Sequence, residues 1–270
     1  MDEHLVGEIV RQPADPALRQ AYAEALREED PQRSQLITAE LAWHSTRTAA
    51  ALADLEQLAS GLDPVWVARI CRPPAGVCCD RVRWEPGAAG PPRPAVLPEQ
   101  LAWLENRFHL RLPSDYRAFL LNYNGGCPAP GYLRLSLPQE RAGCNRWLSY
   151  ACSLWQAADS SLDWDLDLVW RLQQLESDVR QGGRSEQELA RRPGWEREMA
   201  LRWRTPPRDQ WIVIGAGAPT GELEWFCLDC TPGGSGPVYC VDVTAEFPLG
   251  PDACLVAASF REFLALLGSE

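Results

Sequence analysis

Four cysteines in the C-terminal half have the residue type and spacing to hold a metal ion. Cys227 and Cys230 form a Cys-x-x-Cys pair, and Cys240 and Cys254 follow. Four thiolates suit tetrahedral zinc. However, Cys227 and Cys230 lie at the end of an expected strand, where residues i and i+3 point to opposite faces. No helix follows to stabilise a thiolate for redox chemistry. We therefore expect no metal and no cofactor, and keep the four cysteines as weak zinc candidates.

Glycines and histidines suggest two further kinds of chemistry. Gly215, Gly217 and Gly221 could form a phosphate-binding loop, but such a loop is followed by a helix, and here a strand follows. A hairpin turn accounts for these glycines better. The two members of a cysteine–histidine nucleophilic pair can be distant in sequence. The histidines are His4, His44 and His109, and none of them lies in a local motif that indicates such a pair. We therefore predict no catalytic residue and a protein that is not an enzyme.

Aspartates alternate with tryptophans between residues 155 and 170. One interpretation is a solvated helix face with buried tryptophans. The other is a protein interface, because tryptophan is enriched at binding hot spots and carboxylates attract a basic cleft. Two acidic turn residues and a tryptophan that we expect at a sheet edge could extend this surface. The predicted partner-binding residues are Asp159, Asp163, Trp164, Asp165, Asp167, Glu222, Glu224 and Trp225.

The charge of the chain restricts its partners. The 270 residues carry a formal net charge of −11, which repels phosphate backbones and attracts a basic protein. The first residues hold neither a basic nor an apolar segment of a secretory signal, and no apolar run approaches the roughly 20 residues that cross a bilayer. We expect a cytoplasmic protein that binds neither nucleic acid nor membrane, with its cysteines mostly reduced.

The distribution of helix and turn signals predicts two domains. Residues 1–70 show helical spacing, with helix starts at Asp15-Pro16 and Asp63-Pro64, and form a small helical module. Residues 71–96 are rich in proline and glycine and read as a linker. Residues 97–270 combine amphipathic helices with strands at 211–214, 222–228 and 237–243, and a helical insert at about 157–208. The strands predict an antiparallel meander within an α+β domain.

Three blocks of the second region resemble the SUKH superfamily, at residues 96–268. LAWLENRFHLRLPSDYRAFLLNYNGG (Leu101 to Gly126) resembles its signature, WIVIGAGAPTGELEWFCLDC (Trp211 to Cys230) its central hairpin, and Ser259 to Leu264 its terminal helix. The resemblance implies an α+β fold and a binding role without a catalytic motif. Many bacterial members are immunity proteins that neutralise a toxin, often a nuclease or a deaminase. We expect the motif residues to determine the backbone conformation and not to bind a ligand. They are Leu112, Pro113, Asn124, Gly125 and Gly126.

The first 70 residues are similar to a short bacterial repeat-companion domain, which carries no known chemistry. The similarity rests on Asp15-Pro16, Tyr22-Ala23 and Asp30-Pro31. Taken together, the sequence predicts an immunity protein that docks onto a cognate, basic protein toxin. Two alternatives remain open at this point. One is a regulatory or scaffold protein without a toxin partner, and the other is a zinc- or cysteine-dependent protein.

Overall fold

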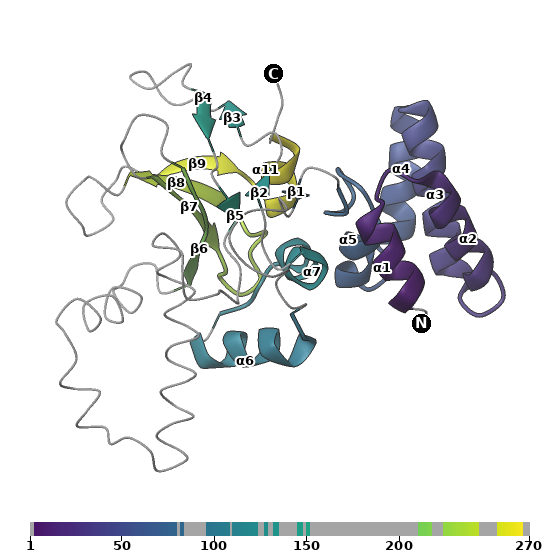
Figure 1. Ribbon diagram of the computed structural model, residues 1–270, viewed down its shortest axis with the longest axis horizontal. Helices are drawn as coiled ribbons and strands as arrows, with labels where there is room; N and C mark the ends of the chain where they lie inside the picture. Colours follow the sequence, from purple (N-terminus) through teal and green to yellow (C-terminus); the bar gives the residue numbers. More distant parts are fainter. Residues whose placement is uncertain are drawn as a thin grey trace, which may run out of the picture.

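In the computed structural model of the protein, the N-terminal part of the chain is helical, and the C-terminal part combines helices with a sheet (Figure 1). The described residues are 3–79, 82–83, 96–108, 110–123, 127–128, 132–134, 145–147, 150–151, 210–217, 224–242 and 253–266. Among them, no helix is both long enough and apolar enough to cross a membrane.

Helices make up the first part of the chain, as predicted. They are α1 (Glu3–Arg11), α2 (Pro16–Leu26), α3 (Pro31–Thr46), α4 (Ala49–Ala59) and α5 (Pro64–Ile70). Asp15, Asp30 and Asp63 each accept a hydrogen bond from a main-chain N–H of the first helical turn, and each precedes a proline. The side chains buried between these helices form one hydrophobic core, which includes Tyr22, Leu36, Ile37, Leu55 and Trp66.

A five-stranded antiparallel sheet forms the second part, with strand order β5-β6-β7-β8-β9. The strands are β5 (Tyr150–Ala151), β6 (Trp211–Gly217), β7 (Glu224–Asp229), β8 (Val238–Asp242) and β9 (Cys254–Ala257). The predicted meander of three strands is confirmed as β6, β7 and β8, whereas β9 was not predicted. Two-stranded ladders join β1 (Val82–Arg83) to β2 (Cys127–Pro128) and β3 (Tyr132–Arg134) to β4 (Asn145–Trp147).

Three helices bury one face of this sheet. They are α6 (Pro98–Phe108), α7 (Ser114–Tyr123) and α11 (Phe260–Leu266). Aromatic rings form the centre of the core, where the ring centroids of Phe119 and Phe260 lie 5.0 Å apart and those of Phe226 and Phe263 lie 5.4 Å apart. Helices packed on a mainly antiparallel sheet, preceded by a helical region, make this the predicted α+β fold.

The two hydrophobic cores meet along residues 71–79. Cys71, Ala75 and Cys78 belong to the core of the N-terminal helices, whereas Val77 and Cys79 belong to the core beneath the sheet. The main-chain N–H of Cys79 donates to the hydroxyl of Tyr123 at 2.9 Å, which ties this segment to α7. In addition, α5 packs on α7, and Arg69 and Asn122 exchange two hydrogen bonds of 3.2 and 2.9 Å. The division of the chain at residues 71–96 stays a proposal.

Pro113, one of the motif residues, lies against a glycine turn. Leu112 is buried in the sheet core, and Pro113 contacts the loop between β7 and β8 at Gly236. Gly236 has φ +72°, a conformation that L side chains rarely adopt, and a Cβ atom there would lie 2.3 Å from Cγ of Pro113. The other motif residues, Asn124, Gly125 and Gly126, lie outside the described residues. The structural role of Pro113 is therefore to fill the space that Gly236 leaves.

Gly236→Ala is expected to destabilise the protein more than Gly233→Ala. Both glycines have positive φ, but a Cβ on Gly233 meets nothing within 4 Å. Gly233→Ala should therefore lower the free energy of unfolding only by the backbone strain, about 1–2 kcal/mol. Gly236→Ala should lower it by about 2 kcal/mol more, because the added Cβ atom also displaces Pro113. Urea unfolding of the two variants measures the difference. An equal loss in both variants would show that the contact with Pro113 contributes nothing.

Candidate protein-interaction surfaces

Most of the predicted partner-binding residues lie outside the described residues. These are Asp159, Asp163, Trp164, Asp165, Asp167 and Glu222. Glu224 and Trp225 belong to β7, where Glu224 pairs with Gly217 and Asp242, and Trp225 pairs with Ala216 and Val241. The acidic surface that these residues would form together stays a prediction.

Trp225 does not lie at a sheet edge, and this expectation was wrong. Its strand, β7, is hydrogen-bonded to β6 on one side and to β8 on the other. The middle strand of a meander has neighbours on both sides, so a residue in it cannot reach an exposed edge. Trp225 stands two residues before Cys227 in this central strand.

The face of the sheet opposite α6, α7 and α11 carries a row of apolar residues. Side chains alternate along a strand. Phe226 and Leu228 enter the core beneath the sheet, so Cys227 between them faces the other way. Cys227 pairs with Tyr239 across β7 and β8, and Tyr239 pairs with Leu255 across β8 and β9. The ring of Trp211 stacks on Tyr239 with centroids 4.4 Å apart. Trp211, Cys227, Tyr239 and Leu255 are called the apolar row below.

The apolar row is accessible to a partner. Leu255 is 60% exposed, and the only other large hydrophobic residue so exposed in the described part of the chain is Leu97, at 55%. Trp211 and Tyr239 are half-buried, whereas Cys227 is buried, with 4% of its surface exposed. Aromatic side chains offer large contact area at little entropic cost and are enriched at hot spots. The row therefore has the composition of the centre of a protein interface.

The apolar row can be predicted only in part from the sequence. Alternation in β6 and β8 indicates that Trp211 and Tyr239 share their strands with residues that face the core. It does not indicate that the two rings stack, because they come from strands that do not neighbour each other in sequence or in the sheet. Strand register and the position of β9 bring Leu255 beside them.

The four cysteines that could have held zinc lie in different positions relative to the sheet. Cys230 and Cys240 belong to the core beneath the sheet, Cys254 packs against that core, and Cys227 belongs to the apolar row. No group of three or more histidine, cysteine, aspartate or glutamate residues within the described ranges could hold a metal ion. Burial raises the pKa of the Cys230 thiol, and the charge of Asp229 raises it further, so this sulfur is a poor nucleophile at neutral pH.

A buried ionic cluster holds the N-terminal helices to residues 71–79. Glu40 on α3 is 1% exposed. It accepts hydrogen bonds from the guanidinium of Arg72 at 2.8 and 3.2 Å and from the Arg72 main-chain N–H at 3.2 Å. Nε of Arg19 lies 3.9 Å away, and Nε2 of His44 lies 3.2 Å away. Burial opposes ionisation of Glu40, but His44 and the two guanidinium groups hold its pKa at about 2.

Arg19 completes this cluster by bonding to the main chain. Although fully buried, it donates to the carbonyl oxygens of Ile70 at 2.6 Å and Pro13 at 3.1 Å, and to Sγ of Cys78 at 3.4 Å. Burial raises the pKa values of the Cys71 and Cys78 thiols beside it, so they remain protonated. Because Glu40 is paired with Arg72 and Arg19 donates to the main chain, the cluster serves to fix the structure.

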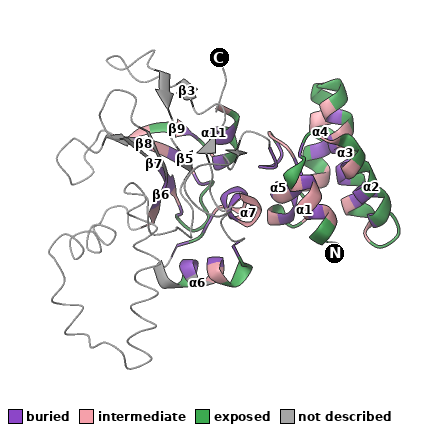
Figure 2. Ribbon diagram, viewed as in Figure 1, coloured by how far each residue is buried: buried purple, intermediate pink, exposed green. Residues whose placement is uncertain are grey.

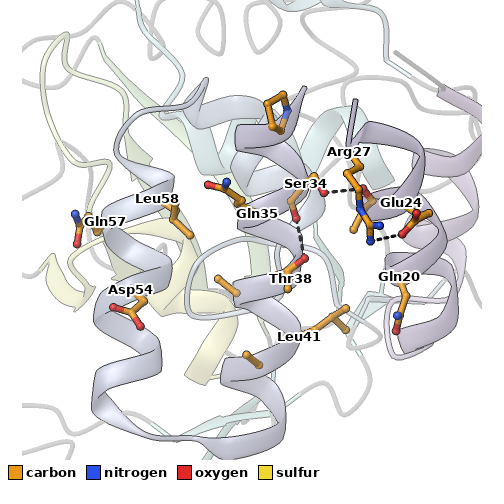
Figure 3. A pocket seen from close by; sticks show the side chains of 14 residues that line it. Gln20, Glu24, Arg27, Ser34, Gln35, Thr38, Leu41, Asp54, Gln57 and Leu58 are labelled. Carbon is orange, nitrogen blue, oxygen red and sulfur yellow. Dashed lines mark hydrogen bonds and ion pairs between the residues drawn. The ribbon is translucent and has the colours of Figure 1, made fainter. Parts of the chain in front are cut away.

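A groove crosses the surface of the N-terminal helices (Figure 3). Its floor is α3 and its walls are α2 and α4, and its volume is about 900 Å³. Residues exposed to solvent are prominent along α2 and α4 (Figure 2). The groove, called the helical groove below, is lined chiefly by Gln20, Glu24, Arg27, Gln35, Thr38, Leu41, Asp54, Gln57 and Leu58.

Comparison with known proteins identifies the second part of the chain. Residues 95–266 match the SMI1 / KNR4 family (SUKH-1). No curated protein and no solved structure matches the chain. The match begins just before α6 and ends with α11, so it spans the described sheet and the three described helices that pack on it. Because it covers more than half of the chain, the protein belongs to the SMI1 / KNR4 family (SUKH-1).

Proposed function

We propose that this protein is an immunity protein that neutralises a cognate bacterial toxin of nuclease or deaminase type by direct docking. The apolar row, on the face of the sheet opposite α6, α7 and α11, carries the proposal. It lies in the part of the chain that matches the family, and it presents an exposed leucine beside two stacked aromatic rings. A surface of this kind suits a protein partner, and neutralisation by docking requires no chemistry from this chain.

The charge of the chain supports a basic partner. With a formal net charge of −11, it would speed the encounter with a basic toxin, and this effect weakens as salt screens the charges. The residues Asp159, Asp163, Trp164, Asp165 and Asp167, together with Glu222, Glu224 and Trp225, remain our proposal for an acidic partner-binding surface. Charge reversal of Asp163, Asp165 and Asp167 should weaken binding, and unchanged affinity would remove them from the interface.

A pull-down of the tagged full chain from its native lysate, at low and at moderate salt, tests the proposed function. We expect recovery of a basic toxin in stoichiometric amount, with less recovered at moderate salt. Recovery of housekeeping or signalling proteins, and of no toxin, would instead favour a regulatory scaffold.

Leu255→Asp is expected to weaken binding of the recovered toxin at least about tenfold, because it would place a carboxylate at the most exposed position of the apolar row. Leu97→Asp is the matched control, since Leu97 is similarly exposed and lies beside the start of α6, away from the row. Both variants should unfold close to the wild-type urea concentration. Calorimetric titration measures the dissociation constants, and equal affinities for the two variants would exclude the row from the interface.

A further inference from the structure

The helical groove is formed by three helices whose side chains do not fill it. Helix α3 packs against both α2 and α4, and its side chains line the floor between these two helices (Figure 3). Ala23 and Ala39 are among the lining residues and bring little bulk to the groove. Small side chains beside the half-buried Leu41 and Leu58 leave an open channel with apolar spots.

Several polar groups in the helical groove have hydrogen-bonding capacity that the described residues do not use. The side-chain amides of Gln20, Gln35 and Gln57 make no hydrogen bond within the described part of the chain, and all three are exposed. Other polar groups of the groove are already used. Thr38 donates to the carbonyl of Ser34 at 3.0 Å, and Ser34 donates to the carbonyl of Ala23 at 2.7 Å. A side-chain amide both donates and accepts, which is what an extended peptide backbone requires of a partner.

The helical groove also has an excess of negative charge. Glu24 forms an ion pair with Arg27 on the same helix, so these two charges offset each other. Asp54 on α4 has no ion-pair or hydrogen-bond partner among the described residues, and it is exposed to the groove. Among the described residues that line the groove, no cation is unpaired. An arginine or lysine of a bound segment would therefore find a carboxylate, whereas an acidic segment would be repelled.

We infer that the helical groove binds an extended, basic segment of a partner protein. The amides of Gln20, Gln35 and Gln57 bond to the backbone of the segment, and Asp54 pairs with one of its arginine or lysine side chains. The groove lies on the N-terminal helices, outside the residues that match the family. The inference thus adds a second docking surface and does not depend on the apolar row.

Selection of random dodecapeptides displayed on phage against the full chain tests this inference. We expect the selected peptides to be enriched in arginine and lysine. The dissociation constant of the best peptide, made synthetically, should rise about tenfold with Asp54→Asn, which removes a charge-assisted hydrogen bond, and severalfold with Gln35→Ala. Both residues are exposed, so neither change should disturb the fold.

Matched controls come from the same helices. Gln32 on α3 and Glu56 on α4 are exposed and do not line the helical groove. Gln32→Ala and Glu56→Gln should leave the dissociation constant unchanged. The inference is overturned if no basic peptide is selected, or if the selected peptide binds Asp54→Asn and Gln35→Ala as tightly as the wild type. Self-association of the chain that both groove substitutions abolish would also overturn it, because the occupant would then be a second copy.

Discussion

Glu40→Ala is expected to lower the free energy of unfolding by about 3–5 kcal/mol, the range for removing one partner of a buried ion pair. The substitution would leave Arg19 fully buried without a counter-charge, and it would free Arg72 from three hydrogen bonds. Because Arg72 lies in the segment in which the two cores meet, we expect the destabilisation to extend beyond α3. Urea unfolding measures the change.

Glu56→Ala provides the control for Glu40→Ala. Glu56 is exposed on α4, and removal of an exposed carboxylate should change the stability by at most about 0.5 kcal/mol. If Glu40→Ala were no more destabilising than Glu56→Ala, the cluster would not hold the N-terminal helices in place.

Because Glu40 is ionised in this cluster, we expect its contribution to the free energy of unfolding to be lost in acid. The pKa of Glu40 is lowered from 4.5 to about 2, so the folded state favours its charged form. The resulting stabilisation is fully present above pH 4.5, and it declines as the pH falls through the folded value of about 2. Glu40→Gln lacks this contribution. The difference in unfolding free energy between wild type and Glu40→Gln should therefore shrink between about pH 4.5 and pH 2, and a constant difference would contradict the assignment.

Gly76→Ala is expected to cost more than about 3 kcal/mol, or to prevent folding, because the clash is with the backbone of a buried turn. A Cβ atom on Gly76 would lie 2.1 Å from the carbonyl oxygen of Cys71 and 2.7 Å from that of Ala68. Neither oxygen can move easily, since Val77 donates to the Ala68 carbonyl at 2.8 Å and Cys78 to the Cys71 carbonyl at 3.0 Å.

Gly61→Ala is the matched control for Gly76→Ala. A Cβ atom on Gly61 would meet nothing closer than 3.8 Å. This substitution should be neutral, or should stabilise the protein by up to about 1 kcal/mol through the unfolded state. Soluble yield and urea unfolding compare the two variants. A Gly76→Ala protein as stable as wild type would mean that residues 71–79 do not pack as tightly as described.

Local signals predicted the secondary structure well where capping and alternation are strong. Asp15-Pro16 and Asp63-Pro64 begin helices, because the aspartate accepts from the first turn and proline needs no hydrogen bond there. Strand β9, with only Cys254 to Ala257, was missed. It is too short to show alternation, and its pairing with β8 depends on residues distant in sequence.

The candidate surfaces could be predicted only in part, because they depend on register and on helix packing. The ionic cluster joins Arg19, Glu40 and Arg72 from distant positions, and no local spacing connects these residues. The apolar row requires the register of four strands, and the helical groove requires the positions of three helices. The sequence did indicate a protein-binding role, since charge and family resemblance do not require atomic positions.

The activity of the recovered toxin, titrated with this protein, tests the proposed function most directly. Activity is expected to fall in proportion to the protein added and to be abolished at a one-to-one ratio. Leu255→Asp is expected to shift the titration to higher concentration, while Leu97→Asp follows the wild type. Full toxin activity at saturating protein would contradict neutralisation by docking, and identical titrations for the two leucine variants would contradict docking through the apolar row.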